Sequence, residues 1–235
     1  AFNNAAGAVT FTAGAITGTT GELRATSFSA DNTTSQTVAA ILGGTGTFAK
    51  SGAGTLTLTG ANTYTGTTTV SGGTLAASAG SLAGTSAIAV NGGALTATNY
   101  NVAATLSIDA TGTATVSGTG LSLAGVTNAN TTANSLNFTG ATGTITLASL
   151  GGAGSTRFGS AATITGGVSA GTVTVVGALT SAVSGGTVSA GSLTASSVTG
   201  GATTVSGAAN VTTFNLGTLT VGGVATIGTL TAGTA

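Results

Sequence analysis

Residues 50–78 read KSGAGTLTLTGANTYTGTTTVSGGTLAAS, and this stretch decides the fold. It contains a run from Thr55 to Thr59 in which apolar and hydroxyl side chains alternate. Because successive residues of a strand face opposite sides of the sheet, Leu56 and Leu58 share one face. The run therefore predicts a half-buried β-strand.

The rest of this stretch predicts a coil with several corners. Glycines separate the first strand from two further short strands, which are predicted at residues 63–65 and 67–70. The Gly-Thr-Leu pattern that begins at Gly54 returns at Gly73, and it returns as Gly-Ala-Leu at Gly93. An interval of nineteen or twenty residues with several short strands is typical of a β-solenoid, whose coils stack about 4.8 Å apart.

At this interval the 235 residues make about eleven coils. We therefore predict an all-β fold without helices, a β-solenoid that forms a single domain over residues 1–235. The composition agrees, because the chain has 54 threonines, which favour extended structure, and no proline. The alternative is a β-sandwich with turns every ~8 to 12 residues, but sandwiches seldom keep a sequence period.

Two later stretches depart from the simple repeat. Residues 128–137 read NANTTANSLN, and this Asn-, Ser- and Thr-rich composition predicts a longer loop at one corner. Residues 167–201 form seven five-residue blocks with Val, Leu or Ala in second place. Such blocks predict three-residue strands joined by two-residue corners. Four sides of this kind would again give a coil of twenty residues, and the pattern hints at a cross-section different from that of the first half.

Charged side chains are rare, and their sum is zero. A chain with so little basic surface is not expected to bind nucleic acid or an anionic membrane, since both depend on Lys and Arg. No stretch approaches the roughly 20 apolar residues of a membrane helix, so no membrane-spanning segment is expected. Low net charge favours association. The charged residues are Glu22, Arg24, Asp31, Lys50, Asp109 and Arg157.

The residues that carry most enzyme chemistry are missing. The chain has no His and no Cys, and by the coil interval Asp31 and Asp109 would lie roughly 20 Å apart, too far for paired carboxylates. We therefore predict no catalytic, cofactor-binding or metal-binding residues and no enzyme activity. Glu22 and Arg24 would share a strand face as a weak surface pair. Lys50 is interpreted as solvated, with an isopeptide bond to an Asn, assisted by Asp31, as the alternative.

Residues 41–75 closely resemble the autotransporter-associated β-strand repeat. The matching segments are Lys50 to Leu56, Gly60 to Gly66 and Val70 to Leu75. The resemblance implies a right-handed parallel β-helix in the passenger of an exported protein at the cell surface of a Gram-negative-type bacterium. The chain begins with Ala rather than Met, as it would after removal of a signal peptide.

Three functions fit these observations. The first is a structural subunit that associates with itself, end to end through uncapped coils, into a surface fibre, sheath or matrix filament. The second is an adhesin passenger that meets cell-surface glycans or matrix with loops such as residues 128–137. The third is ice binding, but the intervals between the Thr-X-Thr pairs predict no continuous ladder. These pairs are Thr55/Thr57, Thr113/Thr115, Thr144/Thr146 and Thr163/Thr165.

Overall fold

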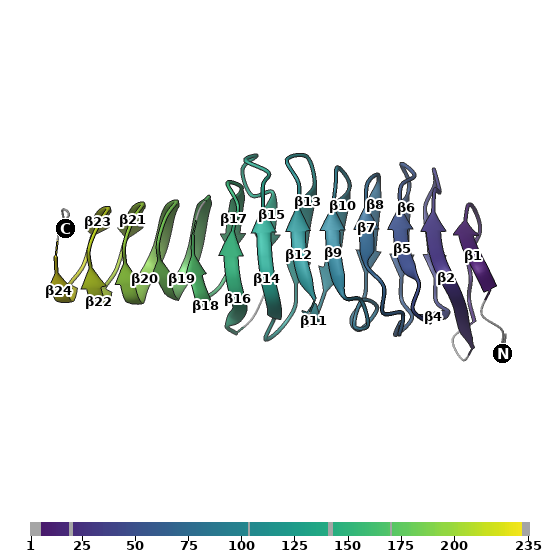
Figure 1. The fold of residues 1–235 in the computed structure, drawn as a ribbon, viewed down its shortest axis with the longest axis horizontal. Helices are drawn as coiled ribbons and strands as arrows, with labels where there is room; N and C mark the ends of the chain where they lie inside the picture. Colours follow the sequence, from purple (N-terminus) through teal and green to yellow (C-terminus); the bar gives the residue numbers. More distant parts are fainter. Residues whose placement is uncertain (1–5, 19–20, 103, 141–142, 170, 232–235) are drawn as a thin grey trace. The chain divides into compact units, whose positions relative to one another are not determined.

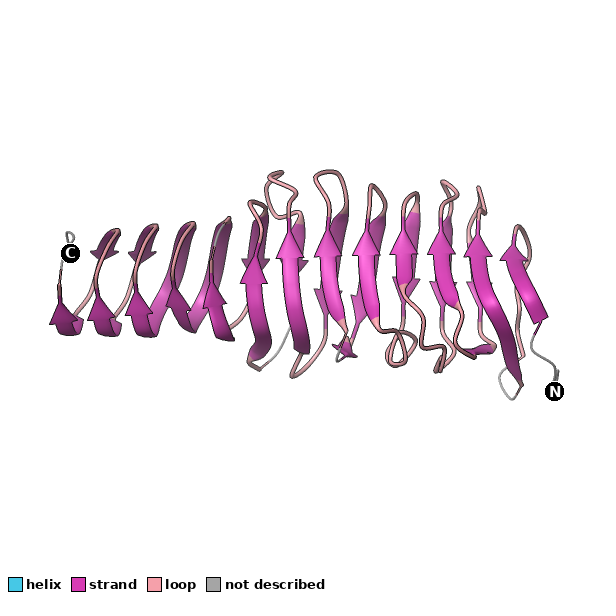
Figure 2. Ribbon diagram, in the orientation of Figure 1, coloured by secondary structure: helices cyan, strands magenta, loops and turns pink. Residues whose placement is uncertain are grey.

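The structure is a computed structural model, in which residues 6–18, 21–102, 104–140, 143–169 and 171–231 are described. These residues form strands and loops and no helix (Figure 2). The strands pair in parallel, coil upon coil, in about eleven turns. The predicted fold class, an all-β parallel solenoid, is confirmed.

The chain divides into two compact units, which are described one at a time. Unit 1 comprises residues 1–117, and its coils follow one another in sequence order (Figure 1). The prediction of one domain stays a prediction. The strands of unit 1 are β1 (Ala6–Phe11), β2 (Glu22–Ala30), β3 (Gln36–Val38), β4 (Ile41–Gly43), β5 (Thr47–Lys50), β6 (Thr55–Leu58), β7 (Thr68–Val70), β8 (Thr74–Ala77), β9 (Ala87–Val90), β10 (Ala94–Thr98), β11 (Asn101–Val102), β12 (Thr105–Ile108) and β13 (Thr113–Ser117).

Successive coils of unit 1 pair in register at the predicted interval. Leu75 of β8 pairs with Leu56 of β6, nineteen residues earlier, and with Leu95 of β10, twenty residues later. All three leucines are buried, whereas Thr55 and Thr57 beside Leu56 are partly exposed. The inward and outward alternation read from the sequence is therefore confirmed, and the apolar residues form columns along the core.

Aromatic side chains form one of these internal columns in unit 1. Phe11 and Phe28 stack with ring centroids 6.3 Å apart, and Phe48 and Tyr64 stack at 5.9 Å. All four side chains are buried. Because offset aromatic pairs add about 0.5–1.5 kcal/mol to the burial of their area, this column stabilises the stacking of coils.

The short strand predicted at residues 63–65 is wrong. The carbonyl of Leu42 accepts hydrogen bonds from both Thr63 N, at 2.8 Å, and Tyr64 N, at 3.1 Å. Two donors on one carbonyl interrupt the one-to-one pairing of a ladder. The segment follows the previous coil without forming a strand, and it still turns the side chains of Asn62 and Tyr64 inward, where both are buried.

Glycine is required where the backbone of one coil rests on the backbone of the coil before it. A Cβ added at Gly52 would lie 2.2 Å from the carbonyl carbon and oxygen of Asp31, and one added at Gly66 would lie 2.2 Å from Gly46 O. Neither neighbour can move aside, because both are main-chain atoms. The glycine corners of the sequence repeat are thus places of close coil-to-coil approach.

Unit 2 comprises residues 118–235. Its strands are β14 (Ser122–Asn128), β15 (Leu136–Phe138), β16 (Ile145–Gly151), β17 (Ser155–Phe158), β18 (Ala162–Val168), β19 (Thr172–Val183), β20 (Thr187–Val198), β21 (Ala202–Val205), β22 (Ala209–Phe214), β23 (Thr218–Val221) and β24 (Ala225–Leu230).

The coils of unit 2 become shorter along the chain. Leu136 pairs with Thr156, twenty residues later, but Thr172 pairs with Thr187 and Thr187 with Ala202, each fifteen residues later. The four-sided, twenty-residue coil predicted for residues 167–201 is therefore wrong, since three five-residue blocks already close one turn. A narrow core explains the difference, because inward residues such as Val173, Leu179 and Val183 fill it without a fourth side.

Within the described residues, no helical segment has the length and hydropathy needed to span a membrane.

Candidate functional site

The polar residues of the sequence repeat link coils of unit 1. Asn62 is buried, its Oδ1 accepts a hydrogen bond from Leu42 N at 2.8 Å, and its Nδ2 donates to Ser81 O at 2.8 Å. Leu42 precedes Asn62 by one coil and Ser81 follows it by one coil. The side chain therefore satisfies main-chain groups on both sides, which is a structural role.

Tyr64 belongs to a short chain of buried hydroxyl groups. Its hydroxyl lies 2.7 Å from Thr68 Oγ1, which lies 3.0 Å from Thr85 Oγ1. Burial raises the pKa of Tyr64 to about 12, and the hydrogen bond to Thr68 acts in the opposite direction. The phenol therefore stays protonated at neutral pH, so it is unsuited to act as a general base there.

Lys50 is buried, although we interpreted it as solvated from the sequence, and that interpretation is wrong. Its Nζ donates to the carbonyls of Gly52 and Gly72, the latter at 3.3 Å. Burial lowers the pKa of this amine, and the charge of Asp31 opposes the shift. Ala30 pairs with Lys50, so Asp31 lies one coil earlier. An isopeptide bond would form at this same Nζ, which is instead hydrogen-bonded to the two carbonyls.

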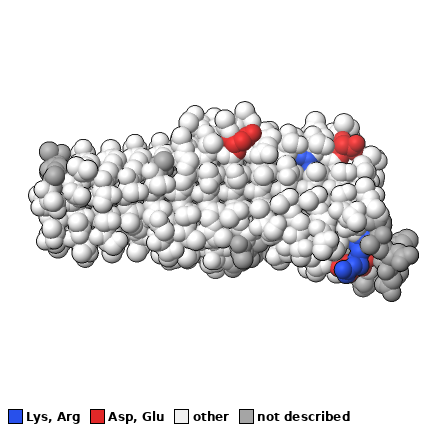
Figure 3. All heavy atoms as spheres, in the orientation of Figure 1, with Lys and Arg blue, Asp and Glu red and all other residues white. Residues whose placement is uncertain are grey.

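The other charged side chains of unit 1 lie at the surface. Arg24 Nη1 donates to Glu22 Oε2 at 2.9 Å, which confirms the predicted pair. A hydrogen bond from Thr63 Oγ1, at 2.7 Å, and the one from Arg24 lower the pKa of Glu22. Asp109 accepts hydrogen bonds from the main chain of Thr111 and Gly112, and these hold its pKa below the usual value. Figure 3 shows charged atoms at only a few places on this face of the molecule.

The two aspartates of the chain do not meet. The registers place Asp31, Ser51, Ser71, Asn91 and Asp109 at one corner of successive coils. Asp31 and Asp109 are thus four coils apart, or about 19 Å at the usual strand spacing. No group of three or more His, Cys, Asp or Glu side chains that could hold a metal ion occurs among the described residues.

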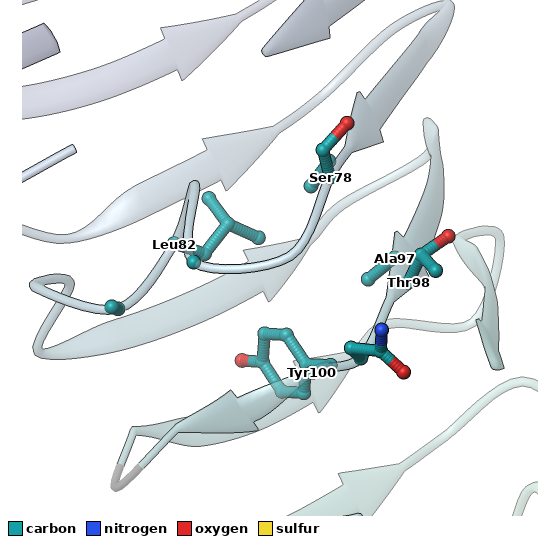
Figure 4. A pocket seen from close by; sticks show the side chains of 9 residues that line it. Ser78, Leu82, Ala97, Thr98 and Tyr100 are labelled. Carbon is teal, nitrogen blue, oxygen red and sulfur yellow. The ribbon is translucent and has the colours of Figure 1, made fainter. Parts of the chain in front are cut away.

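A small cavity lies in unit 1 beside Tyr100 (Figure 4). Its volume is about 20 Å³, and Ser78, Leu82, Ala97 and Thr98 help to line it. This is room for about one water molecule, far below the size of a substrate site. The Tyr100 hydroxyl is buried, has no hydrogen-bond partner among the described residues and points away from Ser78 and Thr98. Burial raises its pKa.

The loop predicted at residues 128–137 of unit 2 connects β14 to β15 and is anchored by hydrogen bonds of buried side chains. Asn128 Nδ2 donates to Ser155 O at 2.9 Å and to Ser135 Oγ at 3.1 Å. Asn128 Oδ1 accepts from the main chain of Asn130 at 3.1 Å. The anchoring side chains are buried, while residues 131–134 at the tip are exposed. The loop is a fixed projection in which the polar anchors face the core.

One row of outward hydroxyl groups runs along unit 2, at positions other than the Thr-X-Thr pairs named from the sequence. The registers align Thr174, Ser189, Thr204 and Thr220 in this row, whereas Ala202 interrupts the neighbouring row of Thr172, Thr187 and Thr218. This row repeats every fifteen or sixteen residues and includes none of the four Thr-X-Thr pairs. The expectation that those pairs form no continuous ladder therefore stays a prediction. Ice binding stays a prediction that a thermal-hysteresis assay can test.

Residues 48–77 match the model of the passenger-associated-transport-repeat. This segment runs from β5 through β8 and includes Lys50, Asn62 and Tyr64. The match confirms the resemblance to autotransporter passenger repeats. Searches of curated proteins and of solved structures gave no match.

Proposed function

Because the chain carries a passenger-associated-transport-repeat inside a parallel β-solenoid, we propose that it is the non-enzymatic passenger of an exported surface protein and acts as an adhesin. The repeat match is the observation that supports this proposal most. The residues of the match bury their polar side chains to join coils, as Asn62 does. A stack built in this way is a rigid support for loops that contact other surfaces.

The loop between β14 and β15 is the contact element we propose. Its exposed tip, residues 131–134, reads TTAN, and it is fixed by the buried side chains of Asn128 and Ser135. A loop that is already ordered loses little conformational entropy when it binds. Its partner in this proposal is a cell-surface or matrix glycan.

Surface display can be tested in the cell that produces the protein. An epitope inserted after Ala133 should be labelled by antibody on intact cells, and protease added outside should remove it. A cytosolic protein tagged in the same way is the control, because it should be labelled only after permeabilisation. Labelling of the solenoid only in permeabilised cells would refute surface display.

Adhesion is tested separately with the purified 235-residue chain. We expect it to bind the surface of cells or matrix, and replacement of residues 131–134 by Gly and Ser should reduce this binding. The matched control is Asn91→Ser, because Asn91 is an exposed corner residue of unit 1. Unchanged binding after replacement of the loop tip would show that another surface is used.

Self-association into a filament is a second candidate function. Leu230 of β24 pairs with Phe214, which is fully buried, yet Leu230 is 57% exposed. Val224 nearby is 73% exposed. In the 235-residue chain by itself, the last described coil presents a core column and a strand edge on which a coil of a second copy can stack.

Light scattering of the 235-residue chain tests this candidate. We expect particles larger than a monomer at high concentration, and Leu230→Lys should shift them toward monomers because it places a charge on the stacking surface. Val176→Lys is the matched control, since Val176 is 56% exposed on the side of unit 2. Monomers at every concentration, or an equal effect of both substitutions, would exclude stacking through this coil.

A further inference from the structure

An open groove of about 260 Å³ lies on the outward face of β18, β19 and β20 in unit 2. Ala182 contributes apolar surface to it. We call it the β18–β20 groove. The hydroxyl-bearing residues that line it are Thr163, Thr165, Thr180, Ser181, Thr194 and Ser196.

The groove arises from unequal lengths of three paired strands. Thr163, Thr180 and Thr194 are register partners, and Val168, Val183 and Val198 are partners again on the far side. From the first row to the second, the residue number rises by five in β18 (163 to 168), by three in β19 (180 to 183) and by four in β20 (194 to 198). The additional residues of β18 and β20 have to bulge, and β19 crosses by the shortest path between them. Ala182 therefore lies in a depression with a bulged strand on each side.

Several hydroxyls of the groove are free to bind a ligand. Within the described part of the chain, Thr163, Thr180, Thr194 and Ser196 make no side-chain hydrogen bond. Corner hydroxyls of the same unit behave differently; Ser184 Oγ, for example, donates to Val168 O at 3.2 Å. The free hydroxyls of the groove can donate and accept, and each needs a partner from solvent or ligand.

The chemistry of the groove selects the class of ligand. From Phe158 to the end of the sequence there is no charged residue, so an ionic ligand would find no opposite charge. No aromatic side chain lines the groove. Hydroxyl groups that both donate and accept are matched by the hydroxyls of a sugar, and the methyl of Ala182 offers a small apolar patch for its ring carbons.

We propose that the β18–β20 groove binds a neutral saccharide. This inference deepens the proposed adhesin function and rests on it, because surface display brings the groove to external glycans. It also names a second contact surface, distinct from the loop between β14 and β15. A ligand that spans several coils would meet register partners at the strand spacing, about 4.8 Å apart.

Binding of the purified 235-residue chain to immobilised dextran, mannan and amylose tests the proposal, with alginate as an anionic probe. We expect binding to at least one neutral polysaccharide and none to alginate. The double variant Thr180→Val and Thr194→Val keeps the side-chain shape and should weaken binding about tenfold, as expected for two lost hydrogen bonds. Ala182→Leu keeps every hydroxyl but fills the groove, and it should weaken binding as well.

The matched control is Thr174→Val with Thr204→Val. It removes two hydroxyls from the outward row in which Thr174 pairs with Ser189 and Ser189 with Thr204. It should change binding less than about twofold, and circular dichroism should show that all variants fold. No binding of wild type to any neutral probe, preference for alginate, or equal loss in the control would overturn the proposal. Surface labelling of intact cells is independent of these results, so the groove can fail while the passenger function stands.

Discussion

Buried polar side chains allow successive coils to stack, because they form hydrogen bonds with main-chain groups of the neighbouring coils. Asn62 was a visible member of the sequence repeat, but its partners, Leu42 N and Ser81 O, lie one coil before and one coil after it. The sequence predicted neither the inward direction of this side chain nor its two partners, because both depend on which main-chain groups the adjacent coils leave unpaired.

Replacement of Asn62 by Ala should destabilise unit 1 by about 2–4 kcal/mol, because it leaves a buried N–H and a buried carbonyl without partners. Chemical denaturation monitored by circular dichroism measures the change. The control is Asn91→Ala, which alters an exposed corner residue and should be nearly neutral. Equal stability of the two variants would contradict the linking role of Asn62.

The two tyrosines allow the burial of single side chains to be tested through the pH dependence of stability. The folded pKa of Tyr64, about 12, lies above its ordinary value of 10.0, so the folded state holds the phenolic proton more tightly. The resulting stability is fully present below pH 10 and is lost as the pH rises from 10 to about 12, on the order of 3 kcal/mol. The pKa of Tyr100 is raised in the same direction.

The chain has 2 Tyr and no Trp, so absorbance near 295 nm reports these groups alone. We expect no tyrosinate at pH 10.5 in the folded chain, and its appearance together with loss of the β-sheet signal at higher pH. Tyr64→Phe should weaken the pH dependence of stability. Full ionisation near pH 10 with the fold intact would contradict the burial of both phenols.

At the scale of elements, corners and bulges determine what the strands can do. The glycine corners were legible in the sequence, because Gly-Gly and Gly-Ala pairs punctuate the alternating runs. The bulges of β18 and β20 were not legible, since a bulge exists only relative to a paired strand. This is why the β18–β20 groove was missed, although Thr163 and Thr165 had been noted as a hydroxyl pair.

Gly73 offers a test of the corners. Its φ is +58°, and an added Cβ would lie 2.3 Å from both Gly52 O and Gly54 O. Gly73→Ala should therefore destabilise unit 1 by more than about 2 kcal/mol, through backbone strain and a clash with the previous coil. Gly18→Ala is the control, because an added Cβ there would meet nothing within 4 Å. Similar denaturation midpoints for both variants would refute the close approach.

At the scale of the whole molecule, the scarcity of charge is the dominant property. The net charge is zero and charged residues make up 3% of the chain. Contacts with sugars or with a second copy then have to rely on hydroxyls and apolar surface, because Coulomb attraction has almost no source. The exposed Glu22–Arg24 pair adds little, as surface pairs are worth about 0–1 kcal/mol.

We therefore expect both self-association and saccharide binding to be almost independent of salt. Raising the concentration of sodium chloride from ~0.01 M to ~1 M shortens the Debye length from about 30 Å to about 3 Å, which would weaken contacts between exposed charges. Light scattering and polysaccharide binding across this range provide the measurement. A large loss of either at high salt would show that charged groups carry the contact.

The sequence by itself determined the solenoid, the interval of unit 1 and the inward and outward alternation, because these follow from local periodicity and β-branched composition. It also determined the lack of charge. Only the tertiary structure decided that three blocks close a coil in residues 167–201, that Lys50 is buried, and that a groove opens at Ala182. A five-residue block fixes the length of a side, whereas the number of sides depends on how the core fills when the coil closes.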